Sequence, residues 1–248
     1  MNYYRAYGRV FPWRLTLDPY KILVSEIMLQ QTQAPRVVEK YKQFLKKFPN
    51  LKSLAQAPLK KVLIAWLGLG YNRRAVNLQK AAQIIIKDHK GKFPKNRKDL
   101  EALPGVGPAT AGDLLAFAFN IAVPLIETNI RSVYIHCFFN DEKNISDADI
   151  MPLIEKTLDK KNPRDWYYAL MDYGAMLKTT RVNPSRRSKH YVKQSSFRGS
   201  NRELRSKILK YSLLYGLKSP KIVAASLDAD ETAVAKNIKA MKKEGLLK

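Results

Sequence analysis

The sequence predicts an all-α protein. Apolar side chains recur every three to four residues along most of the chain, and no segment alternates apolar and polar residues with the period of two that a half-buried strand requires. Turn-forming residues separate the periodic segments, as at Phe48-Pro49-Asn50 and Gly68-Leu69-Gly70. With 248 residues, 46% of them hydrophobic, the chain can bury a substantial core, and we expect more than one compact unit.

Helical segments follow one another through the first three quarters of the chain. The first begins at Pro19, a residue suited to the first helical turn, directly after Asp18, whose side chain can cap the helix. By periodicity the expected helices are 19–31, 36–47, 59–67, 73–89, 98–103, 109–119, 128–139, 147–158 and 164–177.

The composition changes after Thr180. Residues 181–202 carry many positive charges and few apolar side chains, which is typical of a linker or of a basic loop that faces DNA. Three short helices are expected beyond it, at 203–215, 220–227 and 231–243, and together they resemble a small winged-helix unit with its wing cut short. The last of them is lysine-rich and is either a groove-facing helix or a solvated helix packed on the main domain.

The chain is strongly basic, with 45 Lys+Arg against 21 Asp+Glu and a formal net charge of +24. The electrostatic field of this positive charge attracts polyphosphates and gives a protein salt-sensitive affinity for DNA. No segment approaches the roughly 20 uninterrupted apolar residues that span a bilayer. With one cysteine, Cys137, the sequence offers neither an internal disulfide nor a multi-thiolate metal site. We therefore expect a cytoplasmic, nucleoid-associated protein with no membrane partner and no protein-bound metal.

The segment from Leu103 to Ala111 opens a helix with a Gly-x-Gly turn. Glycine lets the main chain come close to a ligand, and the unpaired N–H groups of a helix that begins near Pro108 present partial positive charge to an anion. The pattern favours a socket for one DNA phosphate, and a plain corner between two helices is the alternative. The residues expected to form the socket are Gly105, Val106, Gly107, Ala109 and Thr110.

Two glutamates are candidate catalytic groups. Glu26 neighbours Ile22 and Leu23 one helical turn back, so its carboxyl borders an apolar region that raises its pKa and lets it donate a proton to a leaving group. Glu127 precedes a predicted helix, where a carboxylate stays ionised and can stabilise a developing cation. Such pairs act on sugar carbons that pass through oxocarbenium-like states. The alternatives are an edge position on an amphipathic helix for Glu26 and a helix cap for Glu127.

Short motifs occur in a fixed order along residues 11–178. They are Phe11-Pro12-Trp13-Arg14, Asp18-Pro19-Tyr20-Lys21, Ser25-Glu26-Ile27-Met28-Leu29-Gln30-Gln31-Thr32-Gln33, Trp66-Leu67-Gly68-Leu69-Gly70-Tyr71, the glycine turn, Glu127-Thr128-Asn129 and Met171-Asp172-Tyr173-Gly174-Ala175-Met176. Together they resemble the helix-hairpin-helix DNA glycosylases of the endonuclease III superfamily, and most of all the MutY-type adenine glycosylases. The resemblance implies a two-lobed helix-hairpin-helix glycosylase fold. Its parts would be a six-helix domain at 18–127 with the hairpin at about 95–119, a second lobe from 1–17 plus 128–180, a basic loop at 181–202 and the winged-helix-like unit at 203–248.

The resemblance also implies roles for single residues. Glu26 is the general acid that protonates a flipped purine, at N7, with Arg14 close to it, and Asn129 supports the sugar or the catalytic carboxylate. Gln31 and Tyr71 are the wedge residues that enter the base stack. The arginines expected to contact phosphate are Arg73, Arg74, Arg186 and Arg187.

Departures from the family pattern narrow the expected chemistry. Glu127 stands where the family has aspartate, so the carboxyl is one methylene farther from the main chain. Ala109 occupies the position of the Schiff-base lysine, so we expect hydrolysis of the N-glycosidic bond without strand cleavage. Lys178 occupies the position of the first of four cluster cysteines, so we expect no iron-sulfur cluster. A monovalent cation at the hairpin carbonyls is the one cofactor that the resemblance implies.

The residues after His190 form a short helical pattern, where MutY-type enzymes carry a sizeable domain that inspects oxidised guanine. We expect a monomeric, monofunctional base-excision-repair glycosylase that removes adenine opposite guanine or 8-oxoguanine from double-stranded DNA. Two alternatives stay open. One is a thymine or uracil mismatch glycosylase that acts opposite guanine, and the other is a DNA-binding module that has lost its chemistry.

Overall fold

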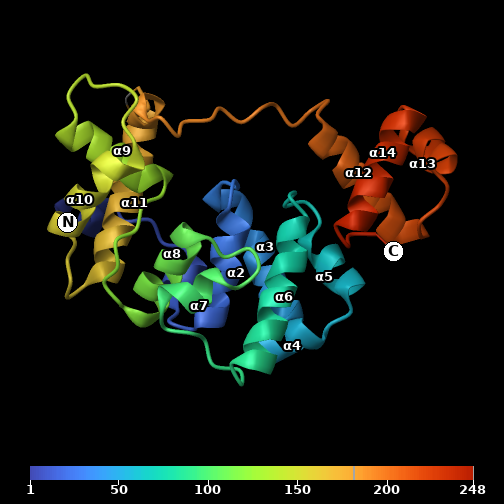
Figure 1. Ribbon diagram of the computed structural model, residues 1–248, viewed down its shortest axis with the longest axis horizontal. Coiled ribbons are helices and arrows are strands. Elements are labelled where there is room, and N and C mark those ends of the chain that lie inside the picture. Colours follow the sequence, from blue (N-terminus) through green and yellow to red (C-terminus); the bar gives the residue numbers. More distant parts are fainter. Residues whose placement is uncertain (181, 248) are drawn as a thin grey trace. The chain divides into compact units, whose positions relative to one another are not determined.

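The computed structural model describes residues 1–180 and 182–247, and within these ranges the regular structure is helical (Figure 1). Among the described residues the one extended pairing is a bridge between Ile145 and Ser188, so the all-α prediction is confirmed. No helix in these ranges is both long and apolar enough to cross a bilayer. Arg181 and Lys248, which begin and end the predicted C-terminal segments, lie outside the described residues.

The helices follow the predicted order with small changes at their ends. They are α1 (Asn2–Tyr7), η1 (Pro12–Leu15), α2 (Pro19–Leu29), α3 (Ala34–Lys47), α4 (Leu51–Gln56), α5 (Leu59–Trp66), α6 (Arg73–Asp88), α7 (Arg97–Glu101), α8 (Pro108–Phe119), α9 (Thr128–Phe138), α10 (Asp147–Thr157), α11 (Pro163–Thr180), η2 (Pro184–Arg187), α12 (Asn201–Tyr215), α13 (Pro220–Leu227) and α14 (Glu231–Lys243).

The chain forms two compact units, each built from separate segments. The first contains residues 1–26, 94–102 and 106–193, and the second contains residues 27–93, 103–105 and 194–248. These units differ from the predicted lobes, which placed 18–127 in one body. One cause is that α8 packs on α11, where the rings of Phe117 and Tyr168 stack with their centroids 4.4 Å apart. The other is that α12 packs on α5, which joins the C-terminal helices to the second unit.

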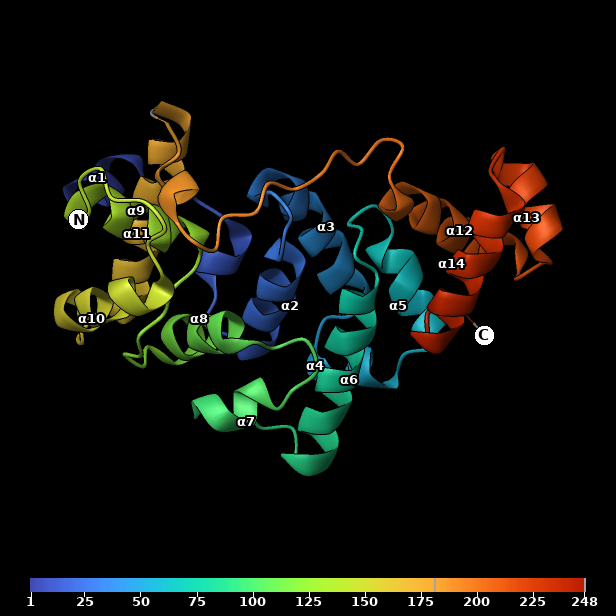
Figure 2. The same ribbon diagram turned by 45° about the horizontal axis from the view of Figure 1, so that its top comes forward.

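In the first unit α9 lies against α11, with α10 beside α9 (Figure 1 and Figure 2). The close approach depends on Gly174 of α11, because a Cβ atom there would lie 2.7 Å from the carbonyl carbon of Asn129. Arg131 at the start of α9 makes two hydrogen bonds to Asp147 of α10, of 2.7 and 2.8 Å. The first turn of α9 is therefore fixed from two sides.

In the second unit α6 packs on α4 and α5 around fully buried side chains such as Trp66 and Phe44. Helix α4 was not predicted, because its six residues are too few to show a period; a capping box between Asn50 and Ser53 starts it. At the end of this unit α12, α13 and α14 pack together around Val234 and Met241.

Candidate active site

Glu26 lies on α2 in the first unit, and its side chain is half-buried. Burial and, to a smaller extent, the charge of Glu127 raise its pKa to about 8, although the guanidinium of Arg14 opposes the shift. An acid with this pKa keeps its proton near neutral pH. The geometry therefore provides a carboxylic acid of the kind that protonates a leaving group.

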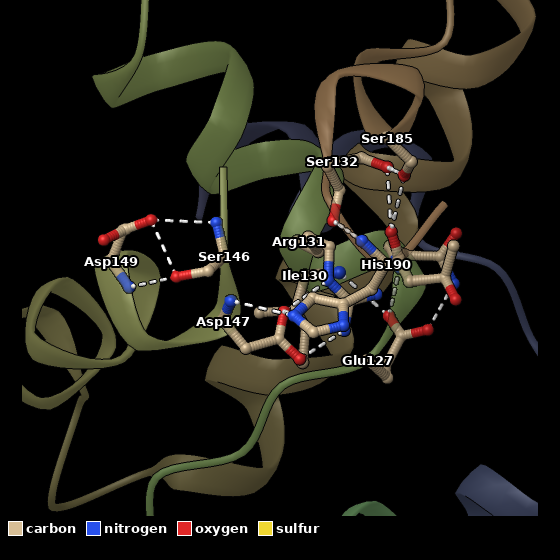
Figure 3. Close-up of polar contacts among 12 residues, drawn as sticks. Glu127, Ile130, Arg131, Ser132, Ser146, Asp147, Asp149, Ser185 and His190 are labelled. Atoms are coloured by element: carbon tan, nitrogen blue, oxygen red, sulfur yellow. Dashed lines mark hydrogen bonds and ion pairs between the residues drawn. The ribbon is translucent and has the colours of Figure 1, made fainter. Parts of the chain in front are cut away.

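Glu127 caps the N-terminus of α9 (Figure 3). Its Oε1 accepts hydrogen bonds from the main-chain N–H groups of Asn129 and Ile130, at 2.7 and 2.9 Å, and its Oε2 accepts one of 3.1 Å from the side-chain amide of Asn129. Burial raises the pKa of this carboxyl above its ordinary value, and the hydrogen bonds and the charges of Lys178 and Arg131 limit that shift. Capping and a charge-stabilising role are therefore compatible, since the hydrogen bonds that cap the helix also favour the ionised form.

Lys178 adds a cation to this arrangement. Its Nζ donates a hydrogen bond of 2.8 Å to Oδ1 of Asn129, and burial lowers its pKa while the charge of Glu127 raises it. Asn129 thus joins Lys178 to Glu127. Sequence reasoning missed this role, because position 178 stands out in the sequence only as a lysine that cannot bind a cluster iron.

Arg14 lies in the same unit, and its direct partner is Asp172 of α11. Its guanidinium donates two hydrogen bonds of 2.8 Å to that carboxylate, and its Cζ lies 4.5 Å from the ring centroid of Tyr168. Arg9 also donates to Asp172, through its main-chain N–H at 2.8 Å and its Nε at 2.6 Å. Although burial raises the pKa of Asp172, these hydrogen bonds hold it below its ordinary value. Arg14 is therefore held in place by Asp172 and acts on Glu26 through its charge.

Asp113 on α8 is a third carboxyl group near the two glutamates. It is 6% exposed, and its Oδ1 has no hydrogen-bond partner among the described residues. Burial raises its pKa well above the ordinary value, and the charges of Glu26 and Glu127 raise it further. Sequence reasoning missed this residue. The available signal was a single charge inside the apolar run of α8.

The predicted wedge residues lie on two loops of the second unit. Gln31 and Tyr71 both have positive φ angles, of 54° and 45°, and both side chains are exposed. Arg74 joins the two loops, because its buried guanidinium donates to main-chain carbonyls on each of them, among them those of Gln30 and Leu69. Helix α2 ends at Leu29, two residues before the predicted end, and Arg74 also donates to the carbonyls of Ile27 and Met28 in its last turn. The guanidinium of Arg74 is thus hydrogen-bonded within the protein and not available to phosphate, contrary to the prediction. Arg73 is exposed.

The glycine turn begins α8 at Pro108, as expected. Gly105 has a φ of 82°, and a Cβ atom there would lie 2.9 Å from Cβ of Asn77. The side chains of Val106 and Thr110 are buried, so these two residues can offer a ligand only their main chain, while Gly107 is exposed and Ala109 half-buried.

The two arginines of η2 differ in their surroundings. Arg187 donates to carbonyl groups at the end of α9, those of Ile135 at 2.9 Å and Phe139 at 2.7 Å, so it holds η2 on that helix. Arg187 is therefore not available to bind phosphate, contrary to the prediction. Arg186 is exposed.

The residues present do not fit a four-thiolate cluster. Within the described ranges no three His, Cys, Asp or Glu side chains are grouped as metal ligands. Cys137 is a single exposed thiol on α9, and Lys178 is bonded to Asn129.

The chain matches the model of the HhH-GPD superfamily base excision DNA repair proteins over residues 24–160. It is 38% identical over 182 residues to an adenine DNA glycosylase of Buchnera aphidicola subsp. Baizongia pistaciae, a match that covers 71% of this chain and 51% of the relative. It is 31% identical to a thymine/uracil-DNA glycosylase of Methanothermobacter thermautotrophicus, covering 71% of this chain and 81% of the relative. A solved thermostable thymine-DNA glycosylase has a TM-score of 0.68 and 30% identity, covering 73% of this chain and 85% of that one. The chain thus spans about half the length of the adenine glycosylases that it matches.

Proposed function

The chain belongs to the HhH-GPD superfamily of base excision DNA repair proteins, and we propose that it is a monofunctional DNA glycosylase that removes adenine opposite guanine or 8-oxoguanine. One observation carries the proposal. A carboxyl group whose pKa is raised to about 8, that of Glu26, shares the first unit with a carboxylate whose two oxygens accept hydrogen bonds, that of Glu127. Such a division of roles suits departure of a base from a sugar.

In the proposed reaction the target nucleotide leaves the base stack, because its reacting atoms are inaccessible inside a duplex. Glu26 donates its proton to N7 of the flipped adenine. The bond between C1′ and N9 then breaks, and its electron pair passes to the protonated base. Positive charge develops on the sugar and is stabilised by Glu127, held in place by its bonds to the first turn of α9. Water then adds at C1′ and gives one proton back to the Glu26 carboxylate, which yields an abasic site, free adenine and the acid form of Glu26.

The absence of strand cleavage follows from the hairpin. Ala109 at the start of α8 offers no amine that could attack the sugar. Lys178 has an amine, but that group donates to Asn129 and faces the charge of Glu127. We therefore propose simple hydrolysis by a monomer, and borohydride should trap no covalent complex with DNA.

The expected lack of an iron-sulfur cluster also remains our proposal. One exposed thiol and a hydrogen-bonded lysine support it. Purified protein should be colourless, and stoichiometric iron in a metal assay would contradict the proposal. A monovalent cation at the hairpin remains a prediction.

A second candidate is a mismatch glycosylase that releases thymine or uracil opposite guanine. It is favoured by the match to a thymine/uracil-DNA glycosylase, which covers 81% of that relative against 51% of the adenine glycosylase. Release of a pyrimidine needs no protonation at N7. Glu26→Gln should therefore harm this activity less than it harms adenine release.

The deciding experiment is a panel of duplexes that carry adenine, thymine, uracil or hypoxanthine opposite guanine and 8-oxoguanine, treated with alkali after incubation. Cleavage at adenine supports the proposed function, and cleavage only at thymine or uracil supports the second candidate. Tight binding without cleavage of any duplex would reject both and indicate a DNA-binding module.

A further inference from the structure

The three C-terminal helices, α12, α13 and α14, pack together within the second unit (Figure 2), and the proposed reaction makes no use of them. Helix α13 ends at Leu227, and residues 228–230 join it to α14, which begins at Glu231. Asp228 adopts a left-handed conformation, with a φ of 48°, and so reverses the chain between the two helices. Two helices joined by so short a turn form a helix-turn-helix, in which the second helix is the one that can enter the major groove of DNA.

One face of α14 is fixed by contacts within the protein. Val234, Ile238 and Met241 recur every three to four residues along this face, and all three are buried. Asn237 is buried beside them, and its side-chain amide donates a hydrogen bond of 2.7 Å to Oδ1 of Asn201 at the start of α12. These contacts determine which face of α14 is left to meet a partner.

The opposite face of α14 carries a stripe of lysines. Lys236, Lys239 and Lys243 are exposed and lie three and four residues apart, so their side chains follow one another along the helix. Thr232, also exposed, lies four residues before the first of them and extends the stripe. At 1.5 Å per residue the stripe is about 16 Å long. It contains no carboxylate.

The positive charge of this stripe is not balanced within the protein. Among the described residues, none of its three lysines forms an ion pair, although carboxylates of α12 and of the α14 C-cap do pair with other cations. Glu203 pairs with Lys207 at 3.0 Å, and Glu244 pairs with Arg205 at 2.7 Å. Like charges three or four residues apart on a helix repel one another and weaken it. A polyanion bound along the stripe would replace this repulsion with attraction.

Duplex DNA is the polyanion that fits the stripe. It carries one negative charge for about every 1.7 Å of its axis, and its major groove is about 12 Å wide, which admits an α-helix. Lysine binds phosphate as a point charge. The stripe presents no arginine and no side-chain amide, so it lacks the planar groups that contact base edges through two hydrogen bonds. We therefore expect contacts to phosphate that do not depend on base sequence.

We propose that α14 lies in the major groove of undamaged duplex DNA and binds its phosphates through the face that carries Thr232, Lys236, Lys239 and Lys243. The proposal does not rest on the proposed function, because undamaged DNA is bound here without release of a base. It assigns a DNA-binding surface to the C-terminal helices that is separate from Glu26 and Glu127.

The direct test measures how the binding of an undamaged duplex of about 24 base pairs by the full-length protein depends on salt, using fluorescence anisotropy from about 50 to 300 mM KCl. Each phosphate that a lysine neutralises adds about 0.9 to the steepness with which log K falls against log salt. The double variant Lys236→Gln and Lys239→Gln should therefore reduce this steepness by about 1.8 and weaken binding at 0.1 M salt about tenfold or more. Glutamine has nearly the helix propensity of lysine, and circular dichroism and melting would show that the variant is folded.

The double variant Lys207→Gln and Lys210→Gln is the matched control, because it removes the same charge from exposed positions on α12, in the same group of three helices. Its salt dependence should equal that of the wild type. Unchanged salt dependence after substitution of Lys236 and Lys239, or an equal reduction in the control, would overturn the proposal. Helix α14 would then be a solvated basic helix.

Two further duplexes test the groove and the lack of sequence preference. The Lys236 and Lys239 variant should lose the same steepness on a DNA duplex of unrelated sequence. It should lose less on duplex RNA, because the major groove of an A-form helix is too deep and narrow for side chains on a helix to reach its floor. A loss confined to one DNA sequence, or an equal loss on RNA, would contradict the proposal. A protein that releases no base from any duplex and still shows the expected loss fails the proposed function and keeps this DNA-binding surface.

Discussion

Nζ of Lys178 donates a 2.8 Å hydrogen bond to Oδ1 of Asn129, and the amide of Asn129 donates to Oε2 of Glu127. A cation on α11 is thereby connected to the carboxylate that caps α9. The resemblance implies a cluster ligand at position 178. Lys178 instead lowers the pKa of Glu127 and so favours the ionised form of this candidate catalytic group.

Lys178→Met should raise the pKa of Glu127, because the charge of Lys178 lowers that pKa. If ionised Glu127 is required, the pH below which the rate falls should move to a higher value. At pH values below the pKa of Glu127, each unit of increase in that pKa lowers the ionised fraction of Glu127 about tenfold. Single-turnover rates between pH 5 and 9 would measure the shift, with Lys156→Met on the exposed face of α10 as a control of equal charge. Identical profiles for the two variants would show that Lys178 has no influence on the site.

Glu26 should determine the pH above which the rate of adenine release falls. Its pKa is raised to about 8, so the proton that it donates is present below that pH and lost above it. Adenine release should therefore decline as the pH rises through about 8. Glu26→Gln should slow release about 10²- to 10⁴-fold, the usual range for loss of a general acid. A wild-type rate that stays level up to pH 10 would exclude Glu26 as the essential acid.

Glu127→Gln separates the two roles of this residue. The amide oxygen of glutamine can still accept from the N–H groups of Asn129 and Ile130, so the cap and the fold should survive. The negative charge is lost, and the excision rate should fall by about 100-fold or more, in line with removal of one electrostatic contact to the transition state. The melting temperature and the single-turnover rate should be measured together. A near-wild-type rate would leave Glu127 as a cap alone.

The fold was more predictable than the site because the two depend on different information. Apolar periodicity is local, so most helices were found within a few residues, and α4 was missed because one and a half turns carry no period. The hydrogen-bond and ion-pair partners of the site residues, in contrast, lie far from them in the sequence. Nothing near Arg14 in the sequence indicates that Asp172 is its partner, and nothing near Arg74 indicates that its guanidinium binds the carbonyls of two loops. The motifs therefore identified the residues of the site, but not which of them are already hydrogen-bonded within the protein.

Asp113 should make the stability of the protein depend on pH. Its folded-state pKa is raised, so the folded protein holds a proton that the unfolded chain releases above about pH 3.9. The stability contributed by this group is present below that pH and is lost as the pH rises toward the folded-state pKa. Asp113→Asn removes the titration and keeps the shape. Denaturant midpoints of the variant and the wild type should therefore be closest near pH 4 and diverge toward pH 8, with the variant higher. Glu26 and Glu127 titrate in both proteins and therefore affect both midpoints. If the two midpoints differ by the same amount at every pH, Asp113 does not hold a proton in the folded protein.

Gly174 should tolerate no side chain. A Cβ atom there would lie 2.7 Å from the carbonyl carbon of Asn129 and 2.9 Å from its Cα, and these are main-chain atoms that cannot rotate away. Gly174→Ala should therefore push α11 from the first turn of α9 and destabilise the protein by about 1–3 kcal/mol, the usual cost of overpacking. It should also displace Asn129 and so slow base release at temperatures where the protein is fully folded. Ala175→Gly on the same helix is the control, since it costs about 1 kcal/mol through helix propensity without moving Asn129. The contrary result is an equal loss of stability in the two variants, with base release at the wild-type rate in both. That result would show that the contact between Gly174 and Asn129 has no part in positioning the site.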